Sequence, residues 1–435
     1  MKHSLTIILT FLSTWVSAHD YVPGQKQNNP ILLRGGDLYT VSDGVKEQTD
    51  LLFENGRITQ IGKNLTSPEN TEVIDVTGKR VYPGLIAPYT SIGLIEIGEV
   101  RATNDISEVG STNPDVQAHV AYNPDSEIIP SVRSNGITTA LIVPGGGLVT
   151  GRSSLINLDG WTVEDAAEKL DVGLHIIWPQ TAVIDAWWME KSLEEQKKEM
   201  AENRKKIYQI FDDARAYYLA RQANPNIKVD SRWEAMIPIL TGERPVFIMA
   251  NDYRQIEQAV SFAREYNLSL ILAGGSEAWM LIDLLKENSI PVILKRTQSL
   301  PMREDEGYDL AYRLPALMAE AGIKFCLSTA GSGGGSATSV RNLPLQAGQA
   351  TAFGLSRREA LRAVTLSTAE ILGVADDLGS LNVGKKATLV VSEGDILDPL
   401  THNVVLEFIE GRRVDLDNKH KELNRKYRQK RFEPK

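Results

Sequence analysis

The middle of the chain alternates short runs of consecutive apolar residues with stretches in which apolar residues recur every three or four positions. The runs of strand type cover residues 138–143, 245–250, 268–273, 290–294 and 324–328. After the second run, four apolar residues share one helical face: Ile256, Ala259, Val260 and Ala263. Asp252 and Gln255 precede them at the spacing of a capping box. Strands alternating with helices predict a parallel sheet, and the number of repeats favours a closed (β/α)8 barrel over an open doubly wound sheet.

Both flanks of this region are rich in short strand patterns instead. In the first flank, residues 31–82, Asn55-Gly56 separates two apolar stretches, which is a strong hairpin signal. In the second flank, two further strand patterns cover residues 387–391 and 404–409. Strands from the two flanks can pair and close each other's edges. We therefore predict a barrel, residues 83–377, inserted into a small β-sandwich formed by residues 22–82 and 378–416.

The first residues have the pattern of a targeting segment. Lys2 is followed by an apolar run from Leu5 to Val16 and by the small residues Ser17 and Ala18. This pattern predicts a signal peptide over residues 1–18 and a periplasmic or secreted protein, and a buried N-terminal helix is the alternative. The run is too short to span a bilayer, so we expect no membrane span.

The net charge bears on the class of partner, and the cysteine content bears on disulfide bonding. The formal net charge is −9, which argues against a nucleic-acid partner. The charged tail, residues 417–435, and the charged stretch 191–206 are both predicted to be solvated helices. The single cysteine, Cys326, lies in an apolar run, so it is expected to be a small buried side chain with no disulfide.

Four segments resemble the amidohydrolase superfamily, in particular its imidazolonepropionase-like and Xaa-Pro dipeptidase-like branches. They cover residues 75–86, 135–147, 355–373 and 378–399. The resemblance implies hydrolysis of carbon–nitrogen bonds other than ordinary peptide bonds, as in cyclic amides or dipeptides. It also implies zinc or another divalent metal at the carboxyl ends of the barrel strands, where the metal activates a water molecule.

The metal ligands that this resemblance implies are replaced in the sequence. Tyr89 and Ser91 occupy the places of the two histidines at the end of strand one. Met249 and Gly274 stand at the histidine places of strands five and six, and Ala330 stands at the aspartate place of strand eight. The bridging lysine of strand four has no clear counterpart. We therefore predict no metal, no other cofactor and no catalytic residue.

No other residues in the sequence indicate a replacement metal site or catalytic site. His119 and His175 are isolated, and the remaining four histidines lie near the two ends of the chain. A metal site made only of Asp and Glu carboxylates is still an alternative, although no spacing of these residues in the sequence indicates one. Ser153 and Ser154 lack the Gly-x-Ser-x-Gly pattern of a serine hydrolase.

The carboxyl ends of the strands should still form a concave mouth. The polar residues predicted to lie there are Tyr89, Ser91, Asn251, Ser276, Glu277, Thr329 and Ser332. They would suit a small polar ligand or a peptide end, or they fill the space of a lost metal. Glu277 alternatively serves as a carboxylate in the first turn of a helix.

Two functional hypotheses remain open from the sequence. One is a hydrolase of carbon–nitrogen bonds. The other is a non-catalytic relative that binds a ligand or pairs with an active amidohydrolase paralogue in the same compartment. Assembly into a homo-oligomer is open under both.

Overall fold

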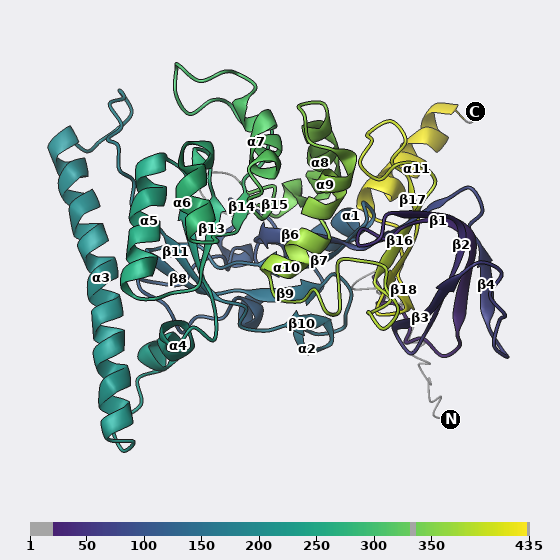
Figure 1. The fold of residues 1–435 in the computed structure, drawn as a ribbon, viewed down its shortest axis with the longest axis horizontal. Coiled ribbons are helices and arrows are strands. Elements are labelled where there is room, and N and C mark those ends of the chain that lie inside the picture. Colours follow the sequence, from purple (N-terminus) through teal and green to yellow (C-terminus); the bar gives the residue numbers. More distant parts are fainter. Residues whose placement is uncertain (1–20, 331–335, 433–435) are drawn as a thin grey trace, which may run out of the picture.

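The computed structural model describes residues 21–330 and 336–432 and shows a mixed α/β fold with three sheets. The predicted signal peptide and Ser332 lie outside these residues. In Figure 1 an eight-stranded sheet lies at one end of the molecule, and a long helix, α3 (Leu193–Ala223), lies at the other. The alternating strands and helices lie between them.

The eight-stranded sheet takes strands from both flanks of the sequence. Its strands are β1 (Ile31–Tyr39), β2 (Val45–Glu54), β3 (Arg57–Gly62), β4 (Glu72–Asp75), β5 (Arg80–Pro83), β16 (Leu389–Ser392), β17 (Val404–Ile409) and β18 (Arg412–Arg413). The flanks meet where β5 pairs antiparallel with β16. Phe53 and Phe408, one from each flank, pack edge to face with ring centroids 5.1 Å apart. The predicted hairpin is confirmed, because Asn55 and Gly56 both adopt positive φ between β2 and β3.

The central strands form two further sheets. One contains β6 (Leu85–Thr90), β7 (Ile137–Ile142), β9 (Ser154–Asn157) and β10 (Ala167–Lys169). The other contains β8 (Val149–Arg152), β11 (Leu174–Ile177), β12 (Val246–Ala250), β13 (Leu270–Gly274), β14 (Val292–Leu294) and β15 (Phe325–Leu327). Pairing is parallel between β6 and β7 and from β11 to β15, as the alternating pattern predicts.

Strands β8 and β9 depart from that pattern, because they pair antiparallel with β11 and β7. The connection after β7 contains no helix, and parallel pairing needs a crossover of about a dozen residues or more. Gly146 and Gly147 turn the chain back with positive φ, so the returning segment runs antiparallel. The glycine-rich stretch after β7 therefore leads directly into β8 and then β9.

Alternate side chains of both central sheets meet in one apolar interior. This interior contains Ile86 and Tyr89 from β6, Leu141 from β7, Leu155 from β9, Phe247 and Met249 from β12, Ile271 and Ala273 from β13, Ile293 from β14 and Cys326 from β15. Cys326 is fully buried and unpaired, as predicted.

Helices cover the outside of the central strands. They are α1 (Ile128–Arg133), α2 (Val163–Ala166), α4 (Ser231–Leu240), α5 (Tyr253–Glu265), α6 (Ile282–Glu287), α7 (Leu310–Glu320), α8 (Leu343–Thr351), α9 (Arg357–Ala363) and α10 (Leu366–Ile371). Short 3-10 turns cover Arg101–Thr103, Ala118–Ala121, Ala278–Leu281 and Thr338–Asn342. The capping box of Asp252 and Gln255 on α5 is confirmed. Helix α10 begins directly after Thr365, and Ser367 is buried within it.

Two charged helices extend from this body. Helix α3 (Leu193–Ala223) begins at a capping box of Ser192 and Glu195 and extends well beyond the predicted stretch. Helix α11 (Lys419–Phe432) is solvent-exposed along the part that the structure describes, as expected for the tail. No helix in the described ranges is both long and apolar enough to cross a bilayer.

Candidate functional site

The predicted mouth residues lie at the carboxyl ends of the strands, but the structure divides them into two groups. Tyr89, Ser91 and Thr329 are buried at the ends of β6 and β15. Asn251, Ser276 and Glu277 are buried together at the ends of β12 and β13. The seventh residue, Ser332, lies outside the described residues.

Asn251, Ser276 and Glu277 belong to one hydrogen-bond network. The Ser276 hydroxyl donates to the side-chain oxygen of Asn251 at 3.0 Å, and the Glu277 backbone N–H donates to the Asn251 carbonyl at 2.9 Å. The Glu277 carboxylate accepts from Arg303 at 2.7 and 3.0 Å and from the backbone N–H of Tyr253 at 2.8 Å. Such a two-pronged arginine–carboxylate contact is among the strong charged hydrogen bonds. Glu277 therefore fastens the loop that carries Arg303 to the end of β13.

A cavity of about 550 Å³ opens beside this network. Its walls come from residues 177–184, the end of β12 with the first turn of α5, and the Glu277–Arg303 pair. Trp178 lines it and donates its indole N–H to Gln258 at 3.1 Å. Of the predicted residues, Asn251 and Glu277 line this cavity.

The five places that the resemblance assigns to metal ligands hold side chains that do not suit a divalent metal. Burial raises the pKa of the Tyr89 phenol, so this group is neutral at physiological pH. Met249 offers a thioether, and its sulfur lies 3.9 Å from the Asn251 side-chain nitrogen. Ser91 offers an alcohol, and Ala330 has no donor atom. Among residues 21–330 and 336–432, no group of three or more His, Cys, Asp or Glu side chains could hold a metal ion.

At Gly274 the backbone itself opposes a side chain. Its φ of +99° is rarely adopted by residues with side chains, and a Cβ there would lie 2.6 Å from Oδ1 of Asn251 and 2.9 Å from the Ala250 carbonyl oxygen. A histidine at this place would require the end of β12 to move. The residues present do not fit the metal centre that the resemblance implies.

Two buried basic residues near the strand ends were not predicted as site residues. His175, on β11, points into the apolar interior, and neither ring nitrogen has a hydrogen-bond partner among the described residues. Burial lowers its pKa to about 3. Lys295 directly follows β14 and is 8 % exposed, without an ion pair among the described residues. Burial, followed by the nearby Arg296, lowers the pKa of Lys295. Their positions in the sequence were the signal that could have identified them. His175 lies at an inward-facing position of a strand, and Lys295 is the first residue after a strand.

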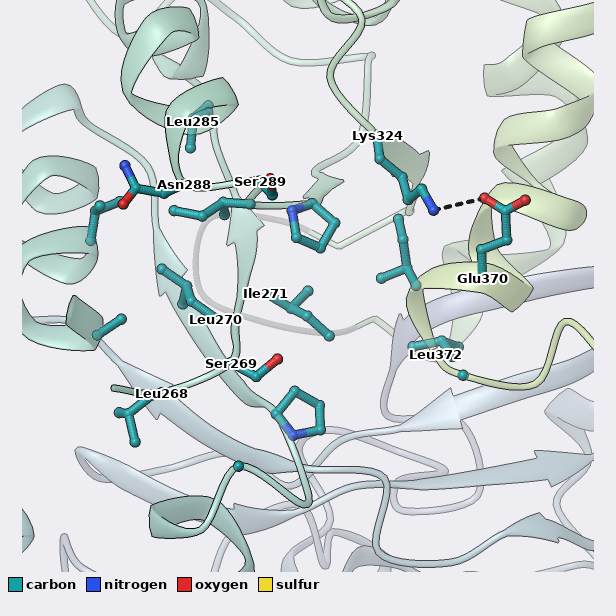
Figure 2. Close-up of a pocket in the computed structure, with 18 of the residues that line it drawn as sticks. Leu268, Ser269, Leu270, Ile271, Leu285, Asn288, Ser289, Lys324, Glu370 and Leu372 are labelled. Carbon is teal, nitrogen blue, oxygen red and sulfur yellow. Dashed lines mark ion pairs between the residues drawn. The ribbon is translucent and has the colours of Figure 1, made fainter. Parts of the chain in front are cut away.

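A larger cavity, of about 830 Å³, lies at the opposite, amino-terminal ends of β12 to β15. Figure 2 shows Leu270 and Ile271 in its wall and the Lys324–Glu370 ion pair, 3.1 Å long, at one side. None of the six described mouth residues lines it. It is therefore separate from the candidate site.

Comparison with known proteins gives a family match for part of the chain and a fold for most of it. The sequence model of the Amidohydrolase family matches residues 262–414. The structure is similar to an amidohydrolase from Thermotoga maritima, with a TM-score of 0.78 and 24 % identity over 88 % of this chain and 99 % of that one.

Two curated relatives are similar over parts of their length. Dihydroorotase of Geobacter metallireducens is 43 % identical over 56 residues, which is 13 % of each protein. Amidohydrolase tasK of Hapsidospora irregularis is 21 % identical over 80 % of this chain and 38 % of its own length. The chain thus spans well under half of either relative.

Proposed function

We propose that this chain, which has an amidohydrolase fold and matches the Amidohydrolase family over residues 262–414, is a non-catalytic binding protein. Its architecture would be a (β/α)8 barrel inserted into a β-sandwich from both flanks. The observation that carries the proposal is the set of side chains at the five metal-ligand places. Hydrolysis in this family relies on a metal that activates water, and these five residues could not hold one.

The cavity beside Asn251 and Glu277 is the proposed binding site. Its volume of about 550 Å³ lies within the range of about 300–1,000 Å³ found for ligand pockets. Its wall carries the guanidinium groups of Arg254 and Arg303 and the carboxylates of Asp252 and Glu277, and Arg303 pairs with Glu277. Tyr253 lies against both guanidinium groups. A small polar ligand or the carboxyl end of a peptide matches this lining.

The surface near the cavity supports a macromolecular partner. Trp187 and Trp188 are exposed on the segment that continues from the cavity wall, and Trp187 is 97 % exposed. Leu300 and Tyr308 are exposed in the loop that carries Arg303. Exposed aromatic and apolar residues gathered around a pocket are typical of interaction sites. An active amidohydrolase paralogue in the periplasm is the partner that we propose, after removal of residues 1–18.

The alternative is a hydrolase of carbon–nitrogen bonds, and the partial family match favours it. Metal analysis of the purified protein, combined with assays on acyl-dipeptides and cyclic amides, separates the two. We expect less than about one tenth of an equivalent of zinc, manganese or iron per chain, and no turnover, because the ligand places lack suitable donors. About one tightly held metal per chain together with turnover would refute the binding proposal.

A further inference from the structure

A third cavity lies at the junction between the eight-stranded sheet and helix α9, away from the proposed binding site. Its volume is about 360 Å³. Its walls come from the end of β1 and the following turn, from β5, from α9 and from the segment after β16. We propose that this cavity binds a small aromatic anion, a ring that carries a carboxylate or phosphate group.

Positive charge exceeds negative charge in the wall. The cations are Arg80, Arg357 and Arg358, and the one anion is Asp395. Arg80 and Arg357 both pair with Asp395, the first at 3.2 Å. Arg358 makes no ion pair or side-chain hydrogen bond with any described residue. Asp398 lies near this group as well, and counting it still leaves one positive charge in excess. A planar guanidinium is well suited to a carboxylate or phosphate.

The remaining wall is aromatic and apolar. The rings of Tyr39 and Tyr82 lie with centroids 4.6 Å apart and planes at 30°. The Arg80 guanidinium lies over the Tyr39 ring, 5.7 Å from its centroid. Leu361 and Leu397 complete the apolar surface. A flat ring can therefore pack against tyrosine and leucine side chains while its charged group faces the arginines.

An unpartnered hydroxyl independently points to a ligand. Tyr82 is 1 % exposed and lines the cavity, yet its hydroxyl has no hydrogen-bond partner in the described part of the chain. Arg80 lies beside it, but a guanidinium can only donate a hydrogen bond, so the Tyr82 hydroxyl proton has no acceptor among the described residues. Burial raises the pKa of Tyr82, so the hydroxyl keeps its proton at neutral pH. Buried polar groups are normally paired, and an oxygen of a bound anion would accept this proton.

A ligand held here would touch elements from both flanks of the sequence and a helix that packs on the central strands. Its binding would stabilise the folded chain, by an amount that rises with the logarithm of the ligand concentration once this exceeds the dissociation constant. This inference concerns a different cavity from the mouth, so it stands or fails independently of the proposed function.

The test is calorimetric titration of the full chain with phenyl phosphate. Inorganic phosphate serves as the anion without a ring, and benzyl alcohol serves as the ring without a charge. We expect phenyl phosphate to bind at least about tenfold more tightly than either control, because only it uses both parts of the wall. If phenyl phosphate fails to bind at about 10 mM, or binds no better than inorganic phosphate, the proposal is wrong.

Three variants locate the site. Arg358→Gln should weaken phenyl phosphate binding roughly tenfold, since it removes a charged donor. Tyr82→Phe should weaken it by a smaller factor while leaving the melting temperature of the free protein unchanged or raised. Arg264→Gln, which removes an exposed arginine without an ion pair on α5, is the matched control and should bind normally. Equal effects of Arg358→Gln and Arg264→Gln would place any binding elsewhere and overturn the assignment.

Discussion

The imidazole of His175 lies flat against the ring of Phe247, with ring centroids 4.4 Å apart and planes at 6°. Tyr89 meets the same imidazole edge-on at 5.5 Å. Within residues 21–330 and 336–432, neither imidazole nitrogen has a hydrogen-bond partner, so protonation would place an unpaired charge in the apolar interior. Burial in this apolar surrounding lowers the pKa of His175 and therefore keeps its imidazole neutral.

This arrangement predicts a loss of stability in acid. The pKa of His175 is about 3 in the folded chain, against an ordinary value near 6.5. Below about pH 6.5 the unfolded chain binds a proton that the folded chain does not, so stability falls until about pH 3. Between pH 7 and pH 5 this loss should reach at most about 2 kcal/mol in urea unfolding.

His175→Phe should remove that part of the pH dependence, because it keeps the stacked ring without a titrating group. The matched control is His420→Gln, which changes an exposed histidine on α11 and should retain the full dependence. Parallel pH profiles for the wild type and His175→Phe would show that His175 is not the responsible group.

A substitution at Gly274 tests whether the neighbouring atoms leave room for a side chain at this position. Gly274→Ala should destabilise the protein by about 2–4 kcal/mol, because strain at positive φ adds to the contact with Asn251. Gly384→Ala is the control, since Gly384 has φ of +93° and open space around its Cβ position. It should cost only about 1–2 kcal/mol. Equal losses in chemical denaturation would mean that the site can accept a side chain.

The Glu277–Arg303 pair predicts that Glu277 acts chiefly through structure. Glu277→Gln should lower the free energy of unfolding by about 1–3 kcal/mol, since a buried carboxylate with three donors becomes a neutral amide. Limited proteolysis should then cut the loop around Arg303 faster. Glu257→Gln, at an exposed position on α5, should change neither quantity. Unchanged stability with loss of ligand binding would instead make Glu277 a ligand-contacting residue.

Local signals in the sequence predicted much of the secondary structure. Asn55-Gly56 and the Asp252–Gln255 capping box are decided by nearby residues, and both are confirmed. The direction of β8 and β9 was missed, because an apolar run indicates a strand but not the direction of its neighbour. The division of the mouth residues was missed for a similar reason. Glu277 finds its partner 26 residues away in Arg303, on a loop whose path no local pattern fixes.

Lys295 is a buried cation directly after β14, and its side chain takes no part in the hydrogen-bond network of Asn251, Ser276 and Glu277. Its backbone N–H donates to the Gly274 carbonyl at 3.1 Å, which places it next to one of the five positions that the resemblance assigns to metal ligands. An ammonium that is buried without an ion pair destabilises a fold. Lys295→Met keeps the length of the side chain and removes the charge, so it should raise the free energy of unfolding by roughly 1 kcal/mol at pH 7.

The comparison for Lys295→Met is Lys286→Met, at an exposed position on α6, which should be neutral within about 0.5 kcal/mol. Groups that lower stability are often kept because the function needs them. Lys295→Met should therefore also weaken binding of any anionic ligand at the mouth, while Lys286→Met leaves it unchanged. If Lys295→Met lowers the free energy of unfolding instead, the ammonium has a favourable partner in the folded chain. Its burial would then be explained without a role in ligand binding.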